Sequence, residues 1–115
     1  MTTPEGKVKA AIDKVLEQYG ARIYRFMFVP SGYGQTTVDY LGCFEGKFFA
    51  IEAKRPGKKP TARQKLILAD IQAAGGRCFV IDDAENTDEL AIWLAAVDST
   101  AKTLRAQVAD TGTVK

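Results

Sequence analysis

The chain has 115 residues, a formal net charge of +2 and 46% hydrophobic residues, a composition ordinary for one soluble globular domain with its own core. It contains no histidine. This absence excludes Ser-His-Asp and Cys-His catalysis, histidine-ligated zinc, and nuclease chemistry with imidazole as the general base. An enzyme built from this chain has to work with carboxylates, lysine and a metal ion.

The sequence gives no sign of a membrane span or of secretion. No apolar stretch approaches the length that crosses a bilayer, and residues 1–5 lack the basic and apolar regions of a secretory signal. We therefore expect a cytoplasmic protein with no membrane partner.

Residues 6–19 form the first predicted helix, which Gly20 ends. Its apolar positions recur at helical spacing and are Val8, Ile12, Val15, Leu16 and Tyr19. At about 100° per residue, Glu5 lies within about 40° of the centre of this apolar stripe and should face inward. Asp13 and Glu17 should lie in solvent. Glu5 can also be read as a first-turn acid that complements the helix dipole.

A β-hairpin is the next predicted unit, after a strand-like segment over Arg22–Val29. The runs Thr36–Phe44 and Lys47–Lys54 are rich in β-formers, and Glu45-Gly46 between them reads as a two-residue turn. If Phe44 faces Lys47, the pairing continues until Asp39 lies opposite Glu52, with Cβ atoms about 5 Å apart. Lys54 points to the same face as Glu52, because side chains alternate along a strand.

Two carboxylates opposite each other destabilise a sheet unless a cation lies between them. Carboxylate oxygens are hard ligands, which favours Mg²⁺ or Mn²⁺. The hairpin register therefore predicts a divalent metal site at Asp39 and Glu52, with Lys54 beside it.

Three further elements complete the predicted order α-β-β-β-α-β-α. A helix over residues 61–74 opens with Thr61 and Gln64 as a capping box, an apolar strand covers Arg77–Asp82, and a last helix starts at Asn86 with Glu89 three residues on. The helical pattern fades after Asp98. The helix between the third and fourth strands implies a parallel crossover beside the antiparallel hairpin, hence a mixed four-stranded sheet.

Apolar residues on both faces of the hairpin strands predict helices on both sides of this sheet. One face would carry Leu41, Cys43, Phe48 and Ala50, and the other Val38, Tyr40, Phe49 and Ile51. The expected fold class is α/β. We expect a single domain, with residues 1–98 as its core and 99–115 as a C-terminal extension of the same domain.

Five motifs in this element order carry a family resemblance. They are Thr3-Pro4-Glu5, Val38-Asp39-Tyr40, the run from Gly46 to Lys54 that ends in Glu52-Ala53-Lys54, the run from Lys59 to Gln64, and Ala74-Gly75-Gly76. Together they resemble the PD-(D/E)XK nuclease superfamily, and more narrowly the stand-alone VRR-NUC domains of bacteriophages. The match covers about residues 4–83, and Val38 stands where the family motif has proline. The resemblance implies a restriction-endonuclease-like α-β-β-β-α-β core.

The resemblance also implies a role for each motif residue. Asp39 and Glu52 would ligate Mg²⁺ or Mn²⁺ together with the Ala53 carbonyl oxygen, and Glu5 would add a fourth ligand. Lys54 would orient the attacking water or neutralise negative charge on the phosphate. Gln64 would position water or substrate, or would serve only as the capping partner of Thr61.

Six cations fall within twelve residues next to the predicted metal site. They are Lys54, Arg55, Lys58, Lys59, Arg63 and Lys65, a density that suits a phosphate backbone. A solvated surface is the alternative reading of such a run, and also of the acidic run over residues 82–89.

The sequence thus predicts a metal-dependent DNA endonuclease, located in the cytoplasm of a bacterial or phage-infected cell. The family resemblance implies branched DNA, such as a four-way junction, as the substrate, and a homodimer with two active sites for paired cuts. Two alternatives stay open: a nucleic-acid-binding module that keeps the fold without catalysis, and an interaction domain whose charges only decorate the surface.

Overall fold

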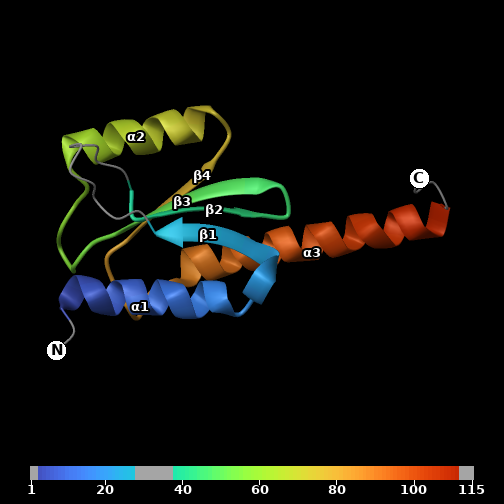
Figure 1. Cartoon of the computed structure of the whole chain (residues 1–115), viewed down its shortest axis with the longest axis horizontal. Coiled ribbons are helices and arrows are strands. Elements are labelled where there is room, and N and C mark those ends of the chain that lie inside the picture. The colour runs from blue at the N-terminus through green and yellow to red at the C-terminus, as the bar shows by residue number, and fades with distance from the viewer. Residues whose placement is uncertain (1–2, 28–37, 112–115) are drawn as a thin grey trace.

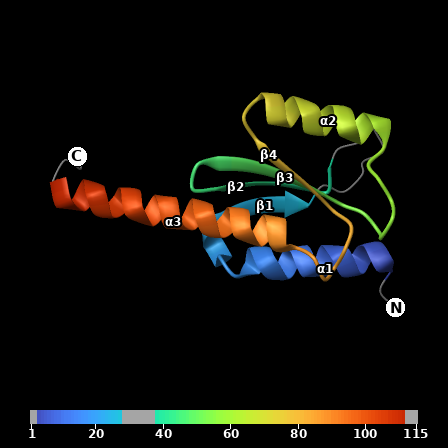
Figure 2. The same ribbon diagram turned by 180° about the vertical axis from the view of Figure 1, so that it is seen from behind.

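A four-stranded mixed sheet separates one helix on one face from two helices on the other (Figures 1 and 2). The structure is a computed structural model that describes residues 3–27 and 38–111. The elements are α1 (Pro4–Glu17), a 3₁₀ turn (Gly20–Arg22), β1 (Ile23–Met27), β2 (Tyr40–Phe44), β3 (Lys47–Ala53), α2 (Ala62–Ala73), β4 (Arg77–Ile81) and α3 (Asp88–Thr111). The predicted order of helices and strands is confirmed.

The strands lie in the order β1-β2-β3-β4, with antiparallel pairing up to β3 and parallel pairing between β3 and β4. In the hairpin, Phe44 pairs with Lys47, and the ladder runs to Tyr40 opposite Ile51, as the sequence predicts. Both turn residues have positive φ, 50° at Glu45 and 78° at Gly46, the combination of a type I′ turn. The prediction of a mixed sheet flanked by helices is therefore confirmed.

The larger core lies between the sheet and the α1 and α3 helices. It contains Tyr40, Phe49 and Ile51 from the hairpin, and Trp93 of α3 packs edge-on against Phe49 and Phe79. Its fully buried helical residues are Val8, Ile12 and Leu16 of α1, and Leu90 and Leu94 of α3.

A smaller core lies under α2 and contains Val38, Ala50 and Leu68. The alternation over the hairpin placed Val38 on the opposite face, with Tyr40, and this prediction is wrong. The chain bends at Asp39, and β2 begins only at Tyr40, so the strict alternation of a strand does not extend back to Val38. The first residues of the predicted strand, 36–37, and the end of the preceding one, 28–29, lie outside the described residues.

Helix α3 begins and ends later than the sequence predicts. A turn closed by Asn86 N–H to the Asp83 carbonyl, at 3.1 Å, occupies the expected capping position, so the helix starts at Asp88. It then continues to Thr111 without a break at Asp98, and its second half projects from the body of the molecule (Figures 1 and 2). Ala, Leu, Lys, Arg and Gln dominate residues 101–109, and these residue types favour helix.

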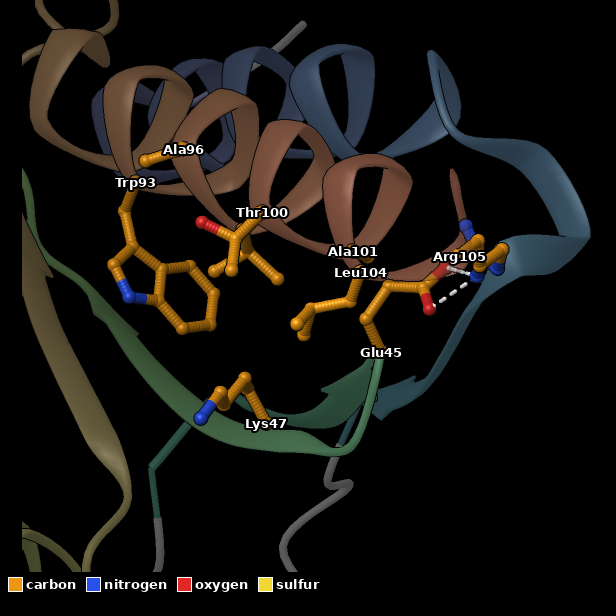
Figure 3. Close-up of a pocket in the computed structure, with 9 residues that line it drawn as sticks. Glu45, Lys47, Trp93, Ala96, Thr100, Ala101, Leu104 and Arg105 are labelled. Atoms are coloured by element: carbon orange, nitrogen blue, oxygen red, sulfur yellow. Dashed lines mark hydrogen bonds and ion pairs between the residues drawn. The ribbon is translucent and has the colours of Figure 1, made fainter. Parts of the chain in front are cut away.

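Ion pairs attach α3 to the turn of the hairpin. Glu45 accepts hydrogen bonds from Arg105 at 2.5 and 2.6 Å and from Arg22 at 3.0 Å, while Arg22 also reaches Asp98 at 2.6 Å. Figure 3 shows Glu45 meeting Arg105 at the edge of a groove, about 530 Å³ in volume, between α3 and the hairpin. Trp93 and Leu104 line its apolar wall. We call the four charged residues of this ion-pair network the α3 clamp; they are Arg22, Glu45, Asp98 and Arg105.

The length of α3 raises the question of a membrane span. It has 24 residues, yet neither α3 nor any other helix in the described part of the chain is apolar enough to cross a bilayer.

Candidate metal centre

Asp39 and Glu52 lie side by side at the open end of the hairpin. The Asp39 N–H donates to Glu52 Oε1 at 3.1 Å, and Asp39 Oδ2 accepts from the Ala53 N–H at 2.8 Å. Asp39 stands at the bend immediately before β2, while Glu52 and Ala53 end β3. The predicted proximity of the two carboxylates is confirmed, although Asp39 is not itself part of the strand.

Glu52 is an ionisable side chain that is buried near the end of β3. It is 1% exposed, and its Oε2 lies 3.0 Å from Lys54 Nζ. Burial raises the pKa of Glu52 to about 7; the Lys54 ammonium opposes this rise, and the charge of Asp39 adds to it. Near neutral pH the carboxylate is therefore close to its midpoint, and an added cation would favour the ionised form.

Lys9 of α1 is a member of the site that the sequence analysis did not identify. Its Nζ lies 3.5 Å from Asp39 Oδ1 and 3.6 Å from Glu5 Oε2. The spacing of four residues between Glu5 and Lys9 was the available signal, because such pairs meet on one side of a helix. It pointed to an ion pair but not to Asp39, which comes from another part of the chain.

Among the described residues, Glu5 is connected to the acidic pair through Lys9. Its side chain is 44% exposed, so it lies at the edge of the site and not inside it. Within residues 3–27 and 38–111, no three acidic, histidine or cysteine side chains are close enough to hold one metal ion. Direct metal ligation by Glu5 stays a prediction.

Asp13 is only partly solvated, with a side chain that is 32% exposed, whereas the helix angles predicted a residue in solvent. It forms an ion pair with Arg25 of β1 at 2.6 Å and accepts a hydrogen bond from the Tyr40 hydroxyl at 3.1 Å. The helix angles describe only which side of α1 is apolar. They do not show that Arg25 of β1 and Tyr40 of β2 reach the side of the helix where Asp13 lies. Glu17 is largely exposed, as expected.

Gln64 forms the capping box of α2. Its Oε1 accepts from the Thr61 N–H at 3.0 Å, and its own N–H donates to Thr61 Oγ1 at 3.1 Å. Gln64 is therefore the capping partner of Thr61, which the sequence analysis gave as its alternative role. A contact with water or substrate would fall to its Nε2 group and stays a prediction.

A groove of about 500 Å³ lies next to the acidic pair, between the start of α1 and the loop that leads from β3 to α2. This loop runs beside the N-terminal end of α1 in both views (Figures 1 and 2). We call it the basic groove; it is lined by Thr3, Pro4, Glu5, Lys54, Arg55, Lys58, Lys59 and Thr61. Lys54 belongs to both features, because its ammonium pairs with Glu52 while its side chain lines the groove.

All five cations predicted to contact DNA are exposed. Arg55, Lys58 and Lys59 lie in the basic groove, whereas Arg63 and Lys65 lie at the start of α2, outside the groove lining. In the part of the chain that the structure describes, none of the five is paired with an acidic side chain. Their charge is available to an anionic partner.

The donors at this site fit Mg²⁺ or Mn²⁺ by their chemistry. Asp39 and Glu52 offer oxygen atoms only, and the Ala53 peptide is held against Asp39, where its carbonyl could add a third oxygen. Two adjacent carboxylates, of which Glu52 is buried and Asp39 is partly exposed, are the kind of environment that a bound cation stabilises.

Comparisons with known proteins add no family to these observations. No protein-family model matches the sequence, and a search of curated proteins returns no similar chain. The resemblance of the motif residues to VRR-NUC domains stays a prediction.

The raised pKa of Glu52 predicts how the stability of the metal-free protein depends on pH. An acid whose folded pKa is raised stabilises the fold below its unfolded pKa of 4.5, and this stability is lost as pH rises through about 7. The shift corresponds to a loss of up to about 3 kcal/mol in the free energy of unfolding. Urea denaturation in EDTA, from about pH 5 to about pH 8, measures it.

The matched control is Glu52→Gln, which removes the titrating group while keeping its size. We expect a flatter pH profile for this variant and higher stability than wild type near pH 8. An identical slope in both proteins would show that Glu52 does not titrate in this range.

Proposed function

We propose that this protein is a metal-dependent endonuclease that hydrolyses DNA phosphodiester bonds, with a restriction-endonuclease-like core of the VRR-NUC type. One observation carries the proposal. Glu52 is buried beside Asp39, its carboxylate is paired with Lys54, and Lys54 lines a groove of exposed cations. A pair of adjacent carboxylates next to a surface of exposed cations is the arrangement that hydrolysis of a phosphodiester needs.

Asp39, Glu52 and the Ala53 carbonyl are the proposed ligands of Mg²⁺ or Mn²⁺, with Glu5 as a further candidate. A metal ion held there would supply Lewis acidity toward the phosphate and a more acidic water. Lys54 orients the nucleophile or stabilises the negative charge that develops on the phosphate oxygens. Gln64 positions water or substrate from the start of α2.

The basic groove gives the proposal its substrate class. Arg55, Lys58 and Lys59 present their charges along one channel, and Arg63 and Lys65 extend the positive surface onto α2. Contacts of this kind neutralise phosphates without reading bases. They suit a nuclease that recognises the shape of branched DNA, such as a four-way junction.

Substitution of the acidic pair or of Lys54 should separate chemistry from folding. We expect Asp39→Asn, Glu52→Gln and Lys54→Ala to reduce Mg²⁺-dependent cleavage by at least about 100-fold, because each removes a charge on which catalysis depends. The carboxylate variants should be as stable as wild type or more so without metal, since the repulsion between Asp39 and Glu52 is relieved. Nicking assays on labelled DNA structures and circular dichroism measure the two effects.

Asp70→Asn serves as the control, because Asp70 is an exposed acid of α2 outside the site. It should cleave like wild type. Full activity in Glu52→Gln would rule out the proposed site, whereas DNA binding without cleavage by wild type would favour the non-catalytic binding module.

Charge reversal in the basic groove should weaken DNA binding without regard to sequence. For Lys58→Glu with Lys59→Glu we expect a lower affinity for all DNA sequences and a slope of log affinity against log salt that is shallower by about 2, because two phosphate contacts are lost. Fluorescence anisotropy across a salt series measures this slope.

A double variant with the same change of net charge controls for long-range electrostatics. Lys14→Glu with Lys47→Glu alters two exposed lysines, on α1 and β3, away from the basic groove. Its slope should stay close to that of wild type. Equal slopes for the two double variants would place the DNA path elsewhere.

We further propose that the protein works as a homodimer, because one small domain offers little surface for holding two arms of a branched substrate. The second half of α3 is the proposed contact; Leu104 lies in this half, is 55% exposed and also lines the groove against the hairpin. Leu104→Glu should then lower the average mass in sedimentation at micromolar concentration. The control Ile92→Glu changes an exposed residue on the part of α3 that packs on the body.

A wild-type protein that is monomeric both free and bound to a four-way junction would remove the paired-cut mechanism. A single-strand nicking or flap-cutting activity would be the remaining form of the proposal.

A further inference from the structure

We infer that Lys9 is a built-in counter-ion of the acidic pair: its ammonium neutralises Asp39 in the metal-free protein, and a divalent cation has to displace it. This inference rests on the proposed metal site and names Lys9 as the residue that sets its affinity. Lys9 acts through Asp39, so it is a positioning residue.

The contacts of Lys9 place its charge beside one of the two candidate ligands. Nζ lies 3.5 Å from Asp39 Oδ1, the carboxylate oxygen that does not accept the Ala53 N–H. The other oxygen is already held by that hydrogen bond at 2.8 Å. Lys9 therefore lies against the Asp39 oxygen that is available to a metal ion.

The backbone of Lys9 is fixed, while its side chain keeps freedom to move. The buried Tyr40 hydroxyl shares its one proton between Asp13 at 3.1 Å and the Lys9 carbonyl at 3.2 Å, and this attaches the turn of α1 that carries Lys9 to β2. The side chain is 30% exposed, and a flexible four-carbon stem carries its ammonium group. Displacement of the ammonium from Asp39 therefore needs a change of rotamer only.

The balance of charge explains why the ammonium and the metal compete. Three carboxylates (Glu5, Asp39 and Glu52) face two ammonium groups, Lys9 and Lys54, so without Lys9 the acidic pair would be undercompensated. A divalent ion bound at Asp39 would make the net local charge positive. It would repel the Lys9 ammonium, because like charges a few ångströms apart repel each other. The favourable response is the departure of Lys9 from Asp39.

With Asp39, Glu52 and the Ala53 carbonyl as the metal ligands, Glu5 is left as a partner for the displaced ammonium. It lies 3.6 Å from Lys9 and lines the basic groove. Lys9 can thus keep one carboxylate partner while its charge moves to the groove side, where the proposed DNA backbone would lie.

Titration of the metal-free protein with MnCl₂, followed by calorimetry, tests the inference without any measurement of activity. We expect Lys9→Met to bind Mn²⁺ about tenfold more tightly than wild type, because the competing cation is gone. Lys9→Arg restores a positive charge and should bind like wild type. Lys14→Met, an exposed lysine of the same helix, is the matched control and should also bind like wild type.

A second readout uses thermal unfolding. In EDTA, Lys9→Met should melt below wild type because Asp39 and Glu52 lose a counter-ion, and saturating Mn²⁺ should raise its melting temperature by more than it raises that of wild type. This measurement also reports whether the variant folds.

The outcomes separate this inference from the proposed function. Equal or weaker Mn²⁺ binding by Lys9→Met, with normal binding by wild type, overturns the role of Lys9 and leaves the metal site standing. A protein that binds no Mn²⁺ with or without Lys9 overturns both.

Discussion

The burial of the Glu52 carboxylate is the constraint on which the rest of the site depends. An ionised side chain in an apolar sheet costs several kcal/mol unless other groups compensate for it. Here the compensation comes from Lys54 at 3.0 Å and from the Asp39 N–H at 3.1 Å. Both partners lie at the open end of the hairpin. The buried carboxylate of Glu52 therefore requires a cation and a hydrogen-bond donor at this place.

Three segments far apart in the sequence converge on this point. Helix α1 brings Lys9 and Glu5, the hairpin brings the acidic pair, and the loop before α2 brings the cations of the basic groove. Tyr40 connects two of these segments, because its hydroxyl contacts the Lys9 carbonyl and Asp13. Desolvation is the main cause that raises the pKa of Tyr40, so this hydroxyl keeps its proton and remains a donor.

The sequence predicted those features that depend on local chemistry. The turn Glu45-Gly46 and the alternation of apolar residues determine the hairpin register, and the register brings Asp39 to Glu52. Likewise, Thr61 and Gln64 form their capping box within one turn of chain. Such features need no knowledge of what packs on them.

The remaining features depend on contacts between distant segments, and a periodic pattern does not contain them. The bend at Asp39 moves Val38 to the α2 face, Lys9 meets Asp39 across thirty positions of sequence, and Asp13 finds Arg25. The second half of α3 was missed for a related reason: it has no apolar core to face, and its helix is supported by residue propensity and by the pair of Arg105 with Glu45.

The α3 clamp shares its hairpin with the acidic pair. Glu45 stands at the closed end of the same hairpin whose open end carries Asp39 and Glu52, and β2 and β3 between them are short, paired and packed on a core. The ladder between the two ends is about 15 Å long. The hairpin is thus one element with two tasks: its closed end holds α3 through Glu45, and its open end holds Asp39 and Glu52 together.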